Sequence, residues 1–306
     1  MVIEEDIKLF KGLFINLIKM NKMRFDNKEF DKATNMLRSF FRDVKGYKEV
    51  HTQNELSILA ACEDPQTIAT YNYNGQLWPL PQTGQMWLEN YLLTYPEENG
   101  FFCVSTSYRN EPNPVEGRHD KIFPMFEFEL KGGMDELRKV EMELLDYLGF
   151  NMAEDENIRL ELNYPRGDYD DICKKYGVEE LEHEHEEQME KDYGRAFFLE
   201  NFPERTSPFW NMKLNEDKVH SNKIDVIIHG IETIGSAERS NNKEEMREKF
   251  KSISGGGYAN ILYAQFSKER VEAELEKFLE YDFFQRSGGG IGMTRMIRAL
   301  KLSNLL

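Results

Sequence analysis

Apolar residues recur at helical spacing in the first part of the chain. Within residues 4–23, Phe10 and Phe14 belong to one apolar face that a helix would bury. A second helix is predicted over 28–44, and Gly46 follows its end. Similar spacing predicts further helices over 134–149, 167–192 (an acidic segment), 243–252, 267–280 and 293–301.

A period of two marks the strands in the middle of the chain. Phe126 and Phe128 alternate with Glu127 and Glu129, so the two carboxylates share one face, either solvated or lining a polar cleft. Strands are predicted over 48–52, 67–73, 100–108, 122–130, 196–200, 207–213 and 223–234, with a glycine-rich turn over 287–292. Helices flank these strands without regular alternation, which predicts an α+β fold with an antiparallel sheet.

Composition narrows the class of protein. The 306 residues are 40% hydrophobic, enough for a sizeable core, and we expect one domain over 1–306 with a helical extension over 1–45. The net charge of −16 argues against a generally basic nucleic-acid-binding surface. No apolar run is long enough to span a membrane, and the acidic start does not resemble a signal peptide. Three scattered cysteines suit a reducing cytoplasm.

The segment 107–127 contains candidate phosphate-binding residues. A strand delivers Arg109 and Glu111 to one face, and a loop returns through Arg118-His119 to a second strand beginning near Phe123. An arginine on each side of this hairpin could hold a polyphosphate, because a guanidinium binds phosphate oxygens at two points. Phe123 could stack on a base. A surface hairpin with ordinary ion pairs remains the alternative.

A second candidate is the glycine-rich segment 287–295. It lacks the Gly-Lys-Ser/Thr of a Walker loop and the spacing of a dinucleotide-binding fingerprint. What remains is a glycine strand, in which residues such as Gly290 and Gly292 would let a ligand approach the backbone closely. Arg295, in the first turn of the following helix, would form an anion site with the helix N-terminus. The alternative is a flexible hairpin before the last helix.

A third candidate covers residues 225–239. Asp225 and Glu232 bracket an apolar strand pair, and carboxylates beside a phosphate site imply Mg²⁺. Before Arg239 lie small residues, among them Ser236, that would leave room for a small substrate. A hairpin turn with scattered charges is the alternative for this segment alone.

Together and in this order, the three segments resemble class II aminoacyl-tRNA synthetases, most closely the aspartyl, asparaginyl and lysyl subgroup. Arg109 to Glu127 resembles motif 2 and Gly288 to Arg295 resembles motif 3. Gly46 to Thr52 resembles motif 1, the dimer-forming segment, so we expect a homodimer. The resemblance extends over roughly residues 46–300 and implies a class II synthetase-like antiparallel sheet flanked by helices.

The resemblance implies that ATP activates an amino acid as an aminoacyl adenylate. Its motifs assign the α-phosphate to Arg109, adenine to Glu111 and Phe123, the outer phosphates to Arg118, His119 and Arg295, and Mg²⁺ to Asp225 and Glu232. The amino-acid carboxylate would attack the α-phosphate in line, so no covalent enzyme nucleophile is needed.

The resemblance implies that the amino acid is aspartate or asparagine. Gln85 and Glu89 resemble asparaginyl-type residues that face the substrate, and Leu88 stands where the aspartyl type has a lysine. Arg239 matches the arginine that reads the side-chain oxygen, and its spacing from Asp225 favours the aspartyl type instead. We also expect Glu127 and Ser236 at the substrate.

Departures from the motifs bear on the acceptor of the activated amino acid. Gln53 replaces the proline of motif 1, and Thr294 replaces the acidic residue before the motif 3 arginine. The Gly-Gly-Gly-Ile-Gly form resembles ammonia-dependent asparagine synthetase, and only some 45 residues precede motif 1 where relatives carry an anticodon-binding barrel. We therefore favour asparagine formation from aspartate and ammonia. The alternatives are a truncated tRNA ligase, a ligase for another acceptor, and an inactive regulatory paralogue.

Overall fold

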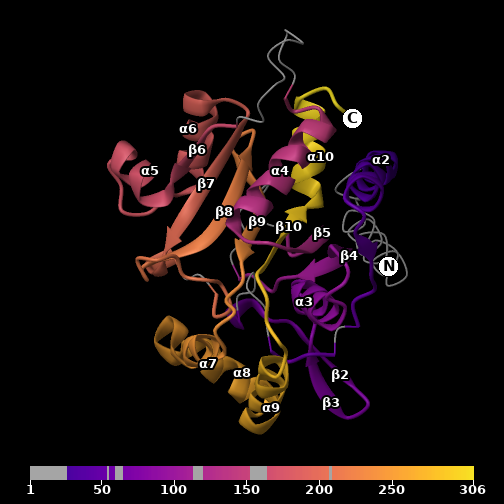
Figure 1. Cartoon of the computed structure of the whole chain (residues 1–306), viewed down its shortest axis with the longest axis vertical. Coiled ribbons are helices and arrows are strands. Elements are labelled where there is room, and N and C mark those ends of the chain that lie inside the picture. Colours follow the sequence, from indigo (N-terminus) through magenta and orange to yellow (C-terminus); the bar gives the residue numbers. More distant parts are fainter. Residues whose placement is uncertain (1–25, 54, 59–64, 113–119, 152–163, 207–208) are drawn as a thin grey trace, which may run out of the picture.

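An eight-stranded, mostly antiparallel sheet forms the centre of the computed structural model (Figure 1). The structure describes residues 26–306 except 54, 59–64, 113–119, 152–163 and 207–208. The strand order is β1-β4-β5-β10-β9-β8-β7-β6, in which only the edge strands β1 and β6 pair in parallel. The strands are β1 (Lys48–Glu49), β4 (Gly100–Tyr108), β5 (Ile122–Lys131), β6 (Arg166–Asp168), β7 (Ala196–Pro203), β8 (His220–Ile228), β9 (Ile231–Glu238) and β10 (Arg286–Gly292). The predicted α+β class is confirmed.

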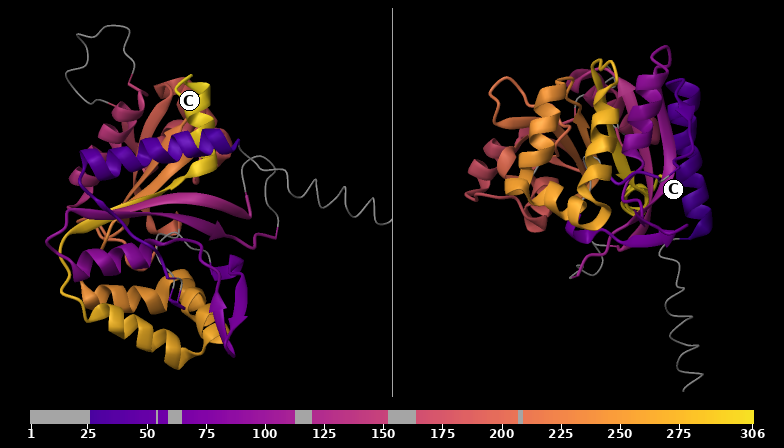
Figure 2. Two further views of the ribbon diagram at one scale, coloured as in Figure 1. Left: turned by 90° about the vertical axis from the view of Figure 1, so that its right-hand side faces the viewer. Right: turned by 90° about the horizontal axis from the view of Figure 1, so that it is seen from below.

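Helices cover both faces of this sheet. Figure 2 shows α2 across one side and α7–α9 gathered on the other. A small hairpin, β2 (Thr70–Tyr73) with β3 (Gln76–Pro79), lies beside α8. The α-helices are α2 (Asn27–Arg38), α3 (Gln85–Thr94), α4 (Met134–Leu148), α5 (Tyr169–Tyr176), α6 (His183–Tyr193), α7 (Lys243–Ser252), α8 (Gly257–Phe266), α9 (Lys268–Leu279) and α10 (Met293–Leu302).

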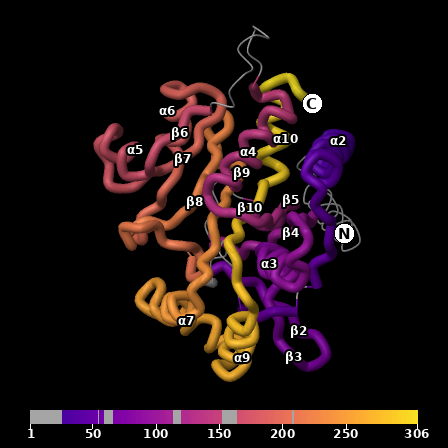
Figure 3. The backbone as a smooth tube through the Cα atoms, viewed as in Figure 1, coloured from indigo at the N-terminus to yellow at the C-terminus, as the bar shows by residue number. Residues whose placement is uncertain are grey.

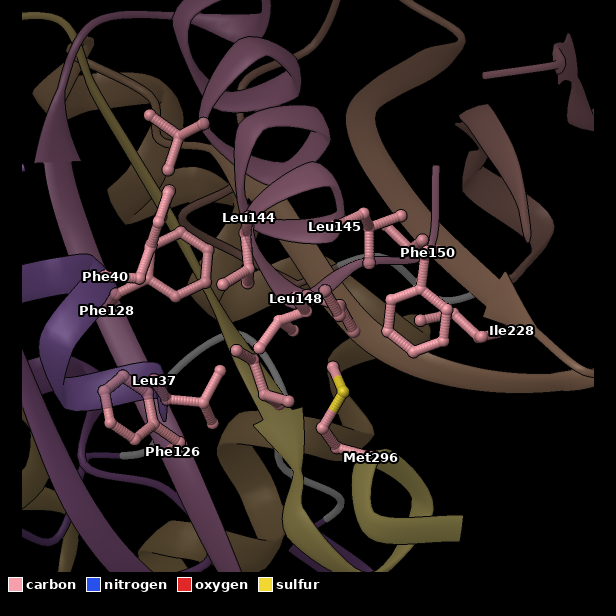
Figure 4. Packing of buried hydrophobic residues seen from close by; sticks show 14 of the residues in the cluster. Leu37, Phe40, Phe126, Phe128, Leu144, Leu145, Leu148, Phe150, Ile228 and Met296 are labelled. Carbon is pink, nitrogen blue, oxygen red and sulfur yellow. The ribbon is translucent and has the colours of Figure 1, made fainter. Parts of the chain in front are cut away.

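The main core lies between the sheet and α2, α4 and α10. Phe126 and Phe128 of β5 are fully buried in it, as their alternation predicts. Figure 4 shows Leu144 and Leu148 of α4 near them, with Met296 from α10. Burial of each such side chain contributes about 1.5–3 kcal/mol. The opposite face of β5 is thereby left to Glu127 and Glu129, which confirms that the two carboxylates share a face.

For the glycine-rich segment the predicted turn is wrong, and the other prediction, a glycine strand, is confirmed. Residues 286–292 form β10, an inner strand that runs between β5 and β9 (Figure 3). Its glycines are needed where neighbouring side chains approach. A β-carbon on Gly288 would lie 2.0 Å from Oε2 of Glu129, and one on Gly289 would lie 2.5 Å from Cβ of Ser236.

Other element boundaries also differ from the expectations. The segment 167–192 is divided into β6, α5 and α6, because Gly177 takes a left-handed conformation that ends α5. In 207–213, residues 207–208 lie outside the described part, and the remainder forms only an isolated bridge between Met212 and Arg239. Helices α3 and α8 were not predicted. The expected helix over 4–23 lies outside the described residues.

Beyond α2, six residues continue as one π-helical stretch, Ser39–Val44, which matches the predicted end of the second helix. Among the described residues, no helix is both long and apolar enough to cross a membrane.

Candidate active site

A cavity of about 340 Å³ lies over β5, β9 and β10, on the face of the sheet opposite the main core. The first turn of α10 and the segment before α3 complete its wall. Predicted site residues that line it are Gln85, Arg109, Glu111, Phe123, Glu127, Glu232, Gly290, Gly292 and Arg295. The structure thus brings together residues from all three sequence segments. Arg118 and His119 lie outside the described residues.

Two arginines from distant parts of the chain reach this cavity. Arg109 directly follows β4, and its backbone N–H donates to the carbonyl of Lys121 at 2.7 Å. The guanidinium of Arg109 lies 5.5 Å from the centre of the Phe123 ring. Arg295 lies in the first turn of α10, and its Nη1 donates to the carbonyl of Glu232 at 2.7 Å. Both guanidiniums are placed where they can bind phosphate oxygens. This is the role that the sequence suggested for Arg109 in the hairpin and for Arg295 at the N-terminus of the last helix.

A β-bulge brings the two candidate metal ligands to one face. Val226 pairs with Ile234, but the next pair is Ile227 with Glu232, so β9 carries one extra residue. Because directly opposed residues share a face, Glu232 lies on the side of Ile227 and of Asp225, two residues away. A β-carbon on Gly235 would lie 2.8 Å from Oε1 of Glu232 and 3.5 Å from Oδ1 of Asp225. The two carboxylates therefore converge over Gly235.

The charge state of these carboxylates suits a divalent cation. Oδ1 of Asp225 is buried and has no hydrogen-bond partner, while Oδ2 accepts from Nζ of Lys223 at 2.5 Å. Burial, with a further contribution from Glu232, raises the pKa of Asp225 to about 7. Burial also acts on Glu232, but the cations of Arg295, Lys223 and Arg109 outweigh it and lower the pKa of Glu232. An orphaned carboxylate oxygen in this position fits an Mg²⁺ ligand.

The remaining ligands of such an ion would come from outside the protein. Among the described residues, no cluster of three histidine, cysteine, aspartate or glutamate side chains converges as a metal cage. Mg²⁺ in nucleotide sites is typically held by one or two carboxylates, with phosphate oxygens and water completing the octahedron. Asp225 and Glu232 supply that number.

Glu127 occupies the part of the cavity beside α3. It is 2% exposed, and its carboxylate accepts hydrogen bonds from the hydroxyls of Thr83 and Ser105. The backbone N–H of Gly84 donates to it at 2.9 Å. Burial raises the pKa of Glu127, although these hydrogen bonds and the Arg109 charge act in the opposite direction. This fixed carboxylate can hold an ammonium group of a substrate.

Three predicted substrate residues lie behind the cavity rather than in its lining. Arg239 is 1% exposed and donates from Nε and Nη2 to the two oxygens of Glu129, both at 3.1 Å. Glu89 is fully buried and pairs with Arg286, with 2.8 Å between Nη2 and Oε2. Ser236 is buried against β10. The direct substrate contacts expected of Glu89, Ser236 and Arg239 stay predictions.

Sequence reasoning missed Arg286 and the pairing role of Glu129. Arg286 directly precedes the glycine run, and its partner Glu89 is 197 residues away. Only the position of Arg286 beside a glycine strand could have drawn attention to it, because nothing local in the sequence indicates a long-range ion pair.

The fold and this cavity define a class of protein. The family model for class II tRNA synthetases (D, K and N) matches residues 9–304. The chain therefore belongs to the class II tRNA synthetase family of the aspartyl, lysyl and asparaginyl type.

Curated relatives agree with this family. The chain is similar to an aspartate–tRNA(Asp) ligase of Pyrobaculum aerophilum, with 26% identity over 297 residues that cover 89% of this chain and 63% of the relative. It is also similar to an asparagine–tRNA ligase of Thermoplasma acidophilum, with 22% identity over 306 residues, 88% of this chain and 66% of the relative. This chain thus spans roughly two thirds of the length of these two relatives.

Solved structures share the fold. Asparaginyl-tRNA synthetase from Pyrococcus horikoshii, complexed with asparaginyl-adenylate, superposes with a TM-score of 0.69 at 22% identity, over 91% of this chain and 66% of that one. A structure described as a putative aspartyl-tRNA synthetase from Leishmania major gives 0.67 at 16% identity, over 91% and 62%. These likenesses establish the α+β architecture with its antiparallel sheet.

Proposed function

We propose that this chain activates aspartate or asparagine with ATP and Mg²⁺ to form an aminoacyl adenylate. The observation that carries the proposal is the convergence of Arg109, Arg295 and Glu232 at one cavity, with Asp225 beside Glu232 over Gly235. Each arginine comes from a different motif of the family, and residues of all three candidate segments, 107–127, 225–239 and 287–295, line the cavity. The family match and the names of the relatives support the same activity.

The reaction needs position and charge rather than a protein nucleophile. A carboxylate oxygen of the amino acid attacks the α-phosphorus, the bond from that phosphorus to the bridging oxygen breaks, and pyrophosphate leaves with the electron pair. Arg109 neutralises charge that develops on the α-phosphate oxygens. Arg295 holds the outer phosphates, and Phe123 supports the adenine ring. When bound through Asp225 and Glu232, Mg²⁺ supplies further neutralisation of the phosphates.

Glu127 orients the amino acid in this proposal. Its carboxylate is fixed by Thr83, Ser105 and the Gly84 N–H, so it presents charge without having to reorganise. A substrate ammonium group beside Glu127 favours the ionised carboxylate. The α-carboxylate of the same amino acid then faces the arginines of the cavity.

The acceptor of the activated amino acid distinguishes two versions of the proposal. Ammonia would convert aspartyl adenylate to asparagine and AMP, whereas a tRNA would take the aminoacyl group as an ester. The names of the relatives favour tRNA, and the glycine-rich β10 sequence prompted the ammonia version. Both begin with the formation of an aminoacyl adenylate, which is aspartyl adenylate in the ammonia version, so adenylate formation is tested first.

ATP–pyrophosphate exchange with each standard amino acid in turn tests the proposal. We expect exchange with aspartate or asparagine and with no other amino acid. Product analysis then assigns the acceptor: free asparagine and AMP on addition of ammonia, or aminoacyl-tRNA on addition of bulk tRNA. Absence of exchange with every amino acid, by protein that still binds ATP, contradicts the proposal and favours an inactive paralogue.

Two expectations accompany this function. Motif 1 contains β1, an edge strand of the sheet, and we propose that a homodimer forms there. Light scattering coupled to size-exclusion chromatography measures the assembly directly. The thiols of Cys103 and Cys173 are free and buried, which agrees with the cytoplasmic location that we propose.

A further inference from the structure

The β8–β9 hairpin is held by side chains at Glu232, the second candidate metal ligand. At the bulge of β9 the ladder is interrupted, and both backbone groups of Glu232 are bound by side chains. Its N–H donates to Oε2 of Glu186 on α6 at 2.9 Å, and its carbonyl accepts from Nη1 of Arg295 at 2.7 Å. The two bonds act on the two peptide planes that flank the Cα of Glu232, so together they fix the direction of its side chain.

Helix α6 lies over the same face of the sheet as the candidate metal site. Its Met189 is fully buried in a cluster with Ile227 of β8, the residue opposite Glu232 in the register. Glu186 comes three residues before Met189, so both project from one side of the helix. Figure 1 shows α6 beside β7 and β8. The Glu186 contact therefore approaches the bulge on the face that carries Asp225.

A second carboxylate of α6 contacts the same hairpin one turn further along. Oε1 of Glu190 lies 2.7 Å from Nδ1 of His229, in the turn between β8 and β9. A β-carbon on Gly230 in that turn would lie 3.0 Å from Cα of Glu187, so the helix and the turn are closely packed. Glu186 and Glu190 are four residues apart and share one side of α6. The helix thus holds the hairpin both at its turn and at its bulge.

We propose that Glu186 is a positioning residue for the metal site: by accepting the Glu232 N–H, it keeps the bulge that directs the Glu232 carboxylate towards Asp225. The inference rests on the metal assignment in the proposed function. Without this acceptor the partly buried N–H loses its partner, and the peptide can turn towards another one. The two carboxylates would then no longer be held together over Gly235.

The charge of Glu186 has an effect of its own, which is separable from the hydrogen bond. Burial raises the pKa of Asp225 most, and the charges of Glu232 and Glu186 raise it further. Glu186 therefore also acts on the metal site through its field. Two substitutions separate these effects. Glu186→Gln removes the charge and keeps an acceptor oxygen at the same reach, whereas Glu186→Asp keeps the charge and shortens the side chain by one methylene.

Titration calorimetry of ATP binding to the full chain, with EDTA and then with saturating Mg²⁺, measures the contribution of the metal site without turnover. The readout is the gain in ATP affinity on addition of Mg²⁺. We expect a gain of about tenfold or more for wild type, and about threefold or less for Glu186→Ala and Glu186→Asp. Glu186→Gln should stay within about twofold of wild type. Glu184→Ala, on the exposed first turn of α6, is the matched control and should equal wild type.

The gain separates positioning from a general loss of stability, because a weakened fold lowers ATP affinity with and without Mg²⁺ alike. Should Glu186→Ala fail to fold, the comparison of Glu186→Asp with Glu186→Gln gives the same answer. An equal loss in those two variants assigns the effect to charge and overturns the inference alone. So does a full gain in Glu186→Asp when Asp225→Asn, which removes a ligand, has lost it. Failure of wild type to bind ATP, or to gain affinity from Mg²⁺, overturns the proposed function together with the inference.

Discussion

The carboxylates of Asp225 and Glu232 meet on one face of the sheet because β9 carries one extra residue between Ile234 and Glu232. In a regular hairpin Glu232 would lie opposite Ile228 and point into the main core. The bulge reverses its direction and places it beside Arg295, at the cavity. The candidate metal site therefore depends on a backbone irregularity as much as on two acidic side chains.

Loss of one carboxylate should weaken the dependence on Mg²⁺ in a measurable way. Asp225→Asn removes the orphaned anionic oxygen, so we expect the Mg²⁺ concentration for half-maximal activation to rise about tenfold or more. Asp171→Asn, on the exposed first turn of α5, is the matched control and should leave it unchanged. A magnesium titration of pyrophosphate exchange measures both. Identical titration curves for wild type and Asp225→Asn would contradict the assignment.

Arg109 is expected to contribute to the rate of adenylate formation and to contribute little to the stability of the fold. It is half-buried at the cavity wall, so Arg109→Ala should lower the rate of adenylate formation by on the order of 10²–10³-fold with little change in melting temperature. Arg298→Ala provides the control, since Arg298 is exposed on α10 and its Nη1 donates to the carbonyl of His229 at 3.1 Å. Near-normal activity of Arg109→Ala would contradict the assignment of Arg109 to the α-phosphate of ATP.

The glycine at position 288 should be irreplaceable. A methyl group there would lie 2.0 Å from Oε2 of Glu129 and 2.3 Å from the carbonyl of Phe128, which forces the ion pair with Arg239 apart. Gly288→Ala is expected to cost about 3 kcal/mol or more in unfolding free energy, as for a broken buried pair. Denaturant unfolding compares it with Gly257→Ala, where the nearest atom is 3.8 Å away at the start of a helix. Equal stability of the two variants would show that β10 is not packed as described.

Glu141 should make stability depend on pH. Burial raises its pKa to about 8 from 4.5, and the charges of Glu200 and Asp225 raise it further. The folded state thus holds this proton more tightly than the unfolded state, so the stabilisation is complete below about pH 4.5 and is lost as the pH rises through about 8.

Glu141→Gln cannot ionise and should gain stability over wild type as the pH rises, on the order of 2–4 kcal/mol near pH 9. Unfolding free energies of wild type and variant between pH 5 and about pH 9 measure the difference. The exposed Glu97→Gln should show no such trend. A constant difference between wild type and Glu141→Gln across this range would mean that Glu141 does not titrate there.

Local patterns predicted most of the architecture around the site. The alternation in β5 placed Glu127 and Glu129 on one face, and helical spacing located α2, α4, α7, α9 and α10. The three candidate segments, taken in order, contained most of the residues expected at the cavity, including Arg109 and Arg295. Strand alternation, helical spacing and short motifs are all set by residues close together in the chain, so they can be recognised in a single sequence.

What the sequence could not predict depends on contacts between distant segments. Glycines usually indicate turns, and only the close approach of Glu129 and Ser236 explains why β10 is an inner strand. No residue pattern near positions 232–234 indicates the β-bulge between Glu232 and Ile234. The pairing of Glu89 with Arg286 joins α3 to β10. These two buried charges therefore lie in a layer behind the cavity, whereas the sequence placed Glu89 in the cavity wall.

Direct detection of the adenylate tests the account most simply. The chain is incubated with ATP, Mg²⁺, pyrophosphatase and either aspartate or asparagine, quenched, and analysed by mass spectrometry for aminoacyl-AMP. We predict an adenylate in an amount comparable to the number of protein chains, and its loss in Arg109→Ala. Binding of ATP without any aminoacyl-AMP, from these or other amino acids, would contradict the central claim.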